Sequence, residues 1–136
     1  MVDIIKLAEG VAAEIGDGAV VALAPEFTLK DVKDKKRTVV VPVGVTHKML
    51  ARGIREDLLK VQIGVLRNAT EDDLEKMVSE VQTLALSMLH KSVEGVVCVS
   101  VDHAPLYDPQ MMRERRQFTG VIDLTFRELN AHELGG

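Results

Sequence analysis

The sequence of 136 residues is poor in cysteine and in aromatic side chains. A single cysteine, Cys98, permits no internal disulfide, which fits a protein that folds in a reducing compartment. There is no tryptophan, and aromatic residues make up only 3% of the chain. Proteins that bind single-stranded nucleic acid stack the bases on aromatic rings, and rings often bind sugars in the same way. This scarcity therefore argues against both classes of function.

Positive charge and long apolar runs are also missing. The formal net charge is −4, so the chain as a whole does not attract nucleic acid or an acidic membrane. No apolar run approaches the roughly 20 residues that a membrane-spanning helix needs, and no charged and then apolar leader opens the chain. We therefore expect a protein that folds in the cytosol and has no membrane partner.

Length and composition predict one domain, residues 1–136. Hydrophobic residues make up 46% and charged residues 28% of the chain, which are ordinary values for a globular protein. A chain of this size buries roughly two-thirds of the surface that its unfolded form exposes, so it can fold without disulfides or metals.

The stretch from Leu59 to Gly95 predicts the core. Leu59–Val65 alternates apolar with other residues, as a strand with one buried face does. Thr70 suits a helix N-cap, the acids after it suit the first helical turn, and Gly95 can end the helix. The apolar residues between them recur at helical spacing, which predicts an amphipathic helix: Leu74, Met77, Val78, Val81, Leu84, Ala85, Met88 and Leu89.

Before this core, the pattern predicts one helix and two strands. Asp3 is a plausible N-cap for a helix over residues 4–15 whose apolar face contains Ile4, Ile5, Ala8, Val11, Ala12 and Ile15. Residues 19–24 and 38–43 read as strands, the second with Pro42 at an edge or a strand end. Residues 44–57 show no periodicity, and we expect a functional or disordered loop there.

After the core, the pattern predicts a strand at 96–101, a short helix at 110–116, a long strand at 118–127 and a frayed tail at 129–136. The element order is therefore α-β-β-β-α-β-α-β. This order predicts an α+β fold, with a largely antiparallel sheet of four to five strands and two long helices packed on one face.

Residues that could carry catalysis are few and scattered. The four histidines are spread over a loop, a helix end, a turn and the tail, and no zinc-binding spacing or phosphate-binding glycine pattern occurs. Asp102 and His103 with Asp108 come nearest to a metal cluster, but capping of a turn explains the acids better. Cys98 lies in a valine-rich strand, which favours an inert core residue. We expect no enzymatic activity, cofactor or metal.

Charge of each sign is concentrated in separate segments. Residues 30–37 carry five basic and two acidic residues, a net of +3, and Arg113, Arg115 and Arg116 form a second basic group. Residues 71–80 carry five acidic and one basic residue, a net of −4. Segregated charge suits head-to-tail association between copies, which closes into a ring if the rotation permits.

Three blocks of strand and turn residues carry a resemblance to a known family. The first runs from Val21 to Val32 and continues in Arg37–Pro42, and the second is Val61–Val65 with the helix after it. The third joins Leu106–Met112 to Phe118–Arg127. In order and spacing, these blocks resemble the tail terminator family of long-tailed bacteriophages and related neck or tail-completion proteins. The last strand ends in Phe-Arg, where Tyr-Arg is common in the family.

The resemblance implies a non-enzymatic structural protein of the virion neck, assembled in the host cytoplasm. Its relatives form a ring, a hexamer, that caps the tail tube, ends tube polymerisation and offers a docking face to head connector proteins. DNA would pass through the channel without specific binding, since anionic walls do not bind phosphates. We expect partner contacts from the basic side chains of the predicted loops and short helix: Lys35, Lys36, Arg37, His47, Arg52, Arg55, Arg113, Arg115 and Arg116.

Two alternatives remain open. The first keeps the class and makes the chain a head-completion or connector protein of the neck. The second is a small cytosolic ligand-binding domain or enzyme with a site beneath residues 44–57. In that case His47, Arg52, Arg55 and His103 would bind an anion.

Overall fold

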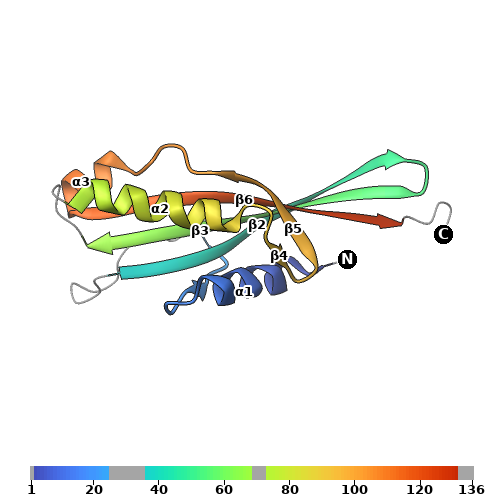
Figure 1. Ribbon diagram of the computed structural model, residues 1–136, viewed down its shortest axis with the longest axis horizontal. Helices are drawn as coiled ribbons and strands as arrows, with labels where there is room; N and C mark the ends of the chain where they lie inside the picture. The colour runs from blue at the N-terminus through green and yellow to red at the C-terminus, as the bar shows by residue number, and fades with distance from the viewer. Residues whose placement is uncertain (1, 25–35, 69–72, 132–136) are drawn as a thin grey trace.

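A computed structural model describes residues 2–24, 36–68 and 73–131 (Figure 1). Lys35, the expected helix cap at Thr70 and residues 132–136 of the predicted tail lie outside the described residues. Residues 129–131, also expected in the frayed tail, are instead the end of the last strand. The elements in chain order are α1 (Ile4–Ile15), β1 (Val20–Val21), β2 (Lys36–Ala51), β3 (Ile54–Asn68), α2 (Leu74–Met88), β4 (Ser92–Val93), β5 (Val96–Asp102), α3 (Pro109–Arg115) and β6 (Gln117–Ala131).

The described strands form one six-stranded sheet in the order β1-β2-β3-β6-β5-β4. The β1–β2 pair is parallel and the other four pairs are antiparallel, so the sheet is mixed. The predicted α+β class is confirmed, and the element order is confirmed except for β4. The predicted strand at 19–24 is β1, although it is only two residues long. The sheet has one strand more than the four to five predicted, because the two-residue β4 is too short to leave a period in the sequence.

Both long helices pack on the same face of this sheet. Leu7 and Val11 of α1 and Val81 of α2 are buried in one cluster with Ile63 of β3 and Phe126 of β6. We call this face the helix face. The Asp3 side chain caps α1 as predicted, accepting hydrogen bonds from the backbone N–H groups of the second and third helical residues at 2.7 and 3.4 Å.

Two details of the predicted helices were wrong. Ile5, expected in the core, is 43% exposed, and Leu7, which was not expected there, is buried beside the predicted Ala8, Val11 and Ala12. The helix expected to end at Gly95 ends at Met88, and Gly95 has φ 80° in the turn between β4 and β5. The intervening Lys91 pairs with Glu14 of α1, Nζ to Oε2 at 3.3 Å.

The segment expected to be an irregular loop, residues 44–57, is a β-hairpin. It consists of the end of β2, a turn at Arg52-Gly53 with φ 81° at Gly53, and the start of β3. Its residues are mostly exposed, so no buried face imposes an alternating pattern on the sequence. Pro42 lies within β2, opposite Val61, where β2 has no outer neighbour among the described residues, so the predicted edge position is confirmed.

The hairpin extends beyond the helices, and the end of β6 runs beside it (Figure 1). We call this three-stranded extension the arm and define it as residues 43–58 of β2 and β3 with residues 128–131 of β6. Helix α3 lies at the other end of the molecule. The longest described helix has 15 residues, and none of the helices in the described ranges could cross a membrane.

Candidate assembly surface

The arm carries a concentration of exposed apolar side chains. Fourteen large apolar side chains are exposed among the described residues, and six of them lie in the arm. Figure 1 shows no helix over this part of the sheet. The six lie on both faces of the arm, with Val45 and Met49 on the helix face and Ile54 and Leu129 on the opposite face. The six are Val43, Val45, Met49, Leu50, Ile54 and Leu129.

A polar cluster ties the three strands of the arm together. Asp57 of β3 is fully buried, and its carboxylate accepts hydrogen bonds from side chains of all three strands. Nδ1 of His47 on β2 lies 2.5 Å from Oδ1, and Nδ2 of Asn130 on β6 lies 2.6 Å from Oδ2. Arg55 on β3 itself completes the set, with Nε 2.9 Å from Oδ1 and Nη2 3.0 Å from Oδ2.

The strand register explains why these four side chains meet. His47 is directly opposite Asp57 across the β2–β3 pair, and Arg55 is directly opposite Asn130 across the β3–β6 pair. Directly opposite residues point to the same face of a sheet, as do residues two apart on a strand. All four therefore lie on the helix face, beyond the region that the helices cover.

The hydrogen bonds keep Asp57 ionised. Burial raises the pKa of this carboxyl. Hydrogen bonds from Arg55, His47 and Asn130, together with the charge of Arg55, lower the pKa by more than burial raises it, so that it is about 2. An ionised carboxylate only accepts hydrogen bonds, so His47 donates from Nδ1. Its ring is 48% exposed and its Nε2 is not part of the cluster.

On the opposite face, a second side-chain contact joins Glu56 of the arm to β6 just below the arm. Nε of Arg127 on β6 lies 2.7 Å from Oε2 of Glu56 on β3. At the base of the arm, the backbone N–H of Val2 donates to Oε2 of Glu128 at 3.2 Å, which joins the start of the chain to β6. Side-chain contacts therefore join β3 to β6 on both faces, one within the arm and one at its base.

The predicted contact residues fall at two ends of the molecule. His47 and Arg55 belong to the Asp57 cluster, and Arg52 is exposed in the turn at the tip of the arm. The rest of the described set lies near α3 and the start of β2. These two segments are close together, because Lys36 of β2 is opposite Arg67 of β3, and Arg67 is opposite Phe118 of β6, which follows shortly after α3. That set is Lys36, Arg37, Arg113, Arg115 and Arg116.

The proposed anion site is wrong, because its four residues do not converge. Arg55 is opposite Asn130 of β6, whereas His103 follows Asp102, which is opposite Asp123. Asp123 and Asn130 are seven residue steps apart on β6, which is about 23 Å. His47 and Arg55 already bond to Asp57, which leaves no common cavity for the four side chains.

The other candidate groups have structural roles. Within the described ranges, no three His, Cys, Asp or Glu side chains are placed to hold a metal ion. Asp108 caps α3, accepting from the backbone N–H groups of Gln110 and Met111 at 3.0 and 3.3 Å. Cys98 is fully buried, as predicted, and burial raises the pKa of its thiol, which disfavours the reactive thiolate.

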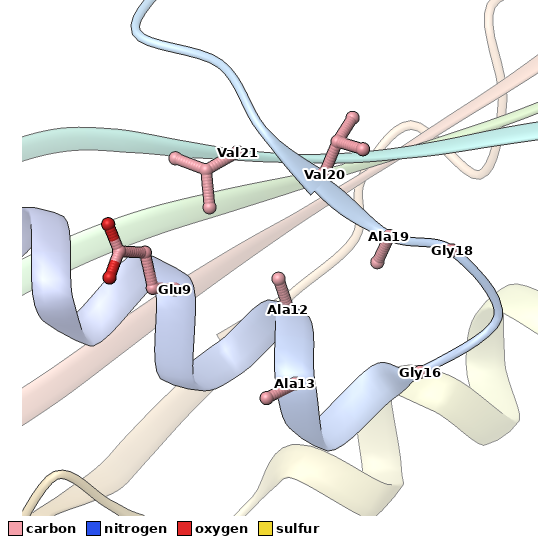
Figure 2. A pocket seen from close by; sticks show the side chains of 8 residues that line it. All are labelled: Glu9, Ala12, Ala13, Gly16, Gly18, Ala19, Val20 and Val21. Carbon is pink, nitrogen blue, oxygen red and sulfur yellow. The ribbon is translucent and has the colours of Figure 1, made fainter.

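A cleft between α1 and β1 has a volume of about 540 Å³ (Figure 2). Figure 2 shows that small side chains line most of it, and among the described residues of its lining only Glu9 is charged. One carboxylate among alanines, glycines and valines offers no pair of groups for acid–base or nucleophilic chemistry. The cleft does not resemble an active site.

Sequence reasoning missed Asp57 and Asn130, the buried acceptor and the donor from β6. In the sequence, Asp57 follows Arg55 and Glu56 and reads as part of a solvated loop. The turn-forming Arg52-Gly53 is the one local signal, because a hairpin centred there brings His47 opposite Asp57.

Comparison of the chain with models of protein families and with curated proteins found no match.

Proposed function

We propose that this chain is a non-enzymatic structural protein of the neck of a long-tailed phage. Its copies form a ring that caps the tail tube, ends polymerisation of the tube and offers a docking face to the head connector. Its partners are further copies of itself, the tail tube protein and the connector proteins. DNA passes through the ring without specific binding.

The arm is the observation that supports this proposal most. It extends past the helices, exposes six large apolar side chains and is braced internally by the buried Asp57. An extended element of this kind has little to contribute to catalysis, since the polar groups of its cluster are bonded to one another. It is suited to binding another protein.

The experiment is a size measurement followed by a tube-capping assay. Light scattering after size exclusion should give a multiple of the 14.9 kDa chain mass, and negative-stain images should show a ring with a central hole. Added to polymerising tail tube protein, the ring should give shorter tubes with one capped end. Tube protein polymerised alone is the control.

Two results would contradict the proposal. A strict monomer, both alone and with tube protein, would exclude a ring. A ring that binds portal-side proteins and ignores the tube would exclude tube capping and place the chain among the connector proteins instead.

A further inference from the structure

Both outer edges of the arm lack a neighbouring strand among the described residues. Strand β1 pairs only with Val39 and Val40 of β2, so β2 has no outer partner from there to its tip. On the other side, β5 pairs with β6 only as far as Arg127. The arm thus presents two open edges, at 45–49 of β2 and at 129–131 of β6. Open strand edges pair readily with other chains.

The hydrogen bonds of the sheet reveal which backbone groups point outward. The backbone N–H of Ala22 donates to the carbonyl of Val40 at 3.0 Å, so Val40 faces away from β3. Val40 is opposite Ile63, and directly opposite residues of an antiparallel pair either bond to each other or both face away. Odd-numbered residues of β3 therefore face β6, and their partners on β2 face outward.

In the arm, those outward-facing partners are Val45, His47 and Met49, which are opposite Leu59, Asp57 and Arg55. On β6, the residues that face away from β3 are the odd-numbered ones, as the hydrogen bond from the Asp108 N–H to the Thr119 carbonyl confirms. Beyond Arg127 these are Leu129 and Ala131.

The outer edge of β2 carries some of the features that protect natural sheet edges, but they lie mainly at its two ends. Proline, lysine, β-bulges and covering loops are the usual protections. The register of β2 is irregular between Pro42 and Gly44 and between Met49 and Ala51, whereas residues 45–49 pair with β3 without interruption. The one proline of β2, Pro42, faces outward at the base of the arm, and beyond it the edge contains one lysine, Lys48. The neighbouring Val45, Met49 and Leu50 are exposed apolar residues, which favour contact with another strand.

We propose that the arms of successive copies join edge to edge, with β2 of one copy beside β6 of the next. This inference rests on the proposed ring and names the interface that would build it. A two-fold contact through one edge would leave the other edge open, whereas head-to-tail pairing satisfies both. Copies related by rotation about a ring axis have their corresponding strands pointing the same way along that axis. Because β2 and β6 are both antiparallel to β3, they run parallel to each other and would pair in parallel.

One register of this β2–β6 pair uses the largest number of outward-pointing backbone N–H and C=O groups. In a parallel pair, a residue bonds to the two residues that flank its opposite number. With His47 opposite Asn130 of the next copy, His47 bonds to Leu129 and Ala131, and Val45 and Met49 supply one further bond each. Within one chain, His47 is level with Glu128, so each copy is staggered by two residues, and a closed barrel needs such a stagger.

This register predicts two disulfide-forming pairs on the face opposite the helices. Lys48 would lie opposite Ala131 of the next copy, and Thr46 opposite Leu129. Neighbouring strands are about 4.8 Å apart, within the range of a disulfide. Inside one chain β3 separates β2 from β6, which puts both pairs roughly 10 Å apart and beyond that range. Any disulfide must therefore join two copies.

The experiment oxidises two full-length double variants, Lys48→Cys with Ala131→Cys and Thr46→Cys with Leu129→Cys, and separates the products on a non-reducing gel. We expect a ladder of covalent oligomers from both variants. The native Cys98 is fully buried and stays in every variant. The matched control pairs Lys48→Cys with Asp123→Cys, an exposed residue of β6 whose outer edge is occupied by Asp102 of β5. The control should give no ladder.

A variant pair tests the backbone bonds independently. Leu129→Pro removes an outward N–H and no bond to β3, so we expect loss of the ring and retention of the monomer fold. Leu129→Ala removes only the side chain and should keep the ring.

Four outcomes would overturn the inference. Covalent dimers from Lys48→Cys alone would mean two-fold pairing of β2 edges. A ladder from the control pair would mean that the copies touch without a fixed strand register. Rings by light scattering with no ladder from either double variant would exclude this interface while the proposed function stood. Monomers of the unmodified protein under all conditions would exclude both.

Discussion

At the scale of single residues, Asp57 is the most unusual side chain in the described structure. A buried carboxylate is strongly destabilising unless its oxygens are fully hydrogen-bonded. Here three side chains supply four bonds, and one of the donors is a guanidinium held in a two-pronged contact. Removing one partner of such a buried group typically costs about 3–5 kcal/mol. We therefore regard Asp57 as the residue on which the arm depends.

The low pKa of Asp57 predicts a loss of stability in acid. Because the pKa falls from 3.8 to about 2 on folding, the stabilisation is complete above pH 3.8 and is lost as the pH falls toward 2. The shift corresponds to about 2 kcal/mol. We expect the unfolding free energies of the wild type and Asp57→Asn, measured with urea, to converge over this pH range.

The control for this measurement is Asp123→Asn, an exposed acid of β6. Its unfolding free energy should stay within about 0.5 kcal/mol of the wild type at each pH. Profiles of the wild type and Asp57→Asn that run parallel from pH 5 to pH 2 would exclude the ionised, hydrogen-bonded carboxylate described above.

At the scale of elements, the sequence predicted the strands and helices that bury one face and missed those that do not. The strand at Leu59–Val65 and the helix at Leu74–Met88 have one buried face each, so their apolar residues recur with a clear period. Residues 44–52 are exposed on both faces, so the strand that they continue has no apolar period in the sequence. The Asp57 cluster was equally hidden, because it depends on a register across three strands.

Helix α2 packs closely on the sheet at Gly120 of β6, where no side chain separates them. A Cβ atom at this position would lie 2.8 Å from Cγ2 of Val81 and 3.2 Å from Cε1 of Phe118. We expect Gly120→Ala to lower the free energy of unfolding by about 1–3 kcal/mol through overpacking. Chemical denaturation measures the change.

Shortening the opposing side chain should relieve this clash. In a double-mutant cycle, Val81→Ala should reduce the cost of Gly120→Ala, giving a coupling of about 0.5–1 kcal/mol or more. Additive effects of the two substitutions would mean that α2 does not contact Gly120 as described.

At the scale of the whole molecule, the long axis separates two kinds of surface. One end is the arm, with apolar side chains and open backbone edges. The other end, around α3 and the start of β2, carries the exposed side chains of Lys36, Arg113, Arg115 and Arg116. In the proposed ring, the arm joins copies to one another, and the basic end is left for an acidic surface on the tube or connector.

This division predicts that the basic end can be neutralised without loss of the ring. We expect the variant Arg113→Gln, Arg115→Gln, Arg116→Asn to keep its size by light scattering. Its binding to tube or connector protein should weaken severalfold in co-sedimentation and depend less on salt, because exposed charges are screened over about 8 Å at physiological ionic strength.

A matched control neutralises two exposed cations of the helices, Lys6→Gln with Lys76→Gln, and should bind partners as the wild type does. Unchanged partner binding by the arginine variant, with the same salt dependence, would exclude the basic end as a docking face. Loss of the ring in that variant would contradict the division between the two ends.

The bracing of the arm by Asp57 has a consequence for the thermodynamics of association. A flexible segment must lose internal conformational entropy when it binds, and this loss weakens the affinity. The arm is already cross-linked between all three strands by its own side chains, so in the proposed ring a neighbouring copy would meet it in the shape it keeps. Association then costs mainly the rigid-body freedom of the two molecules, and a small contact area can suffice for tight binding.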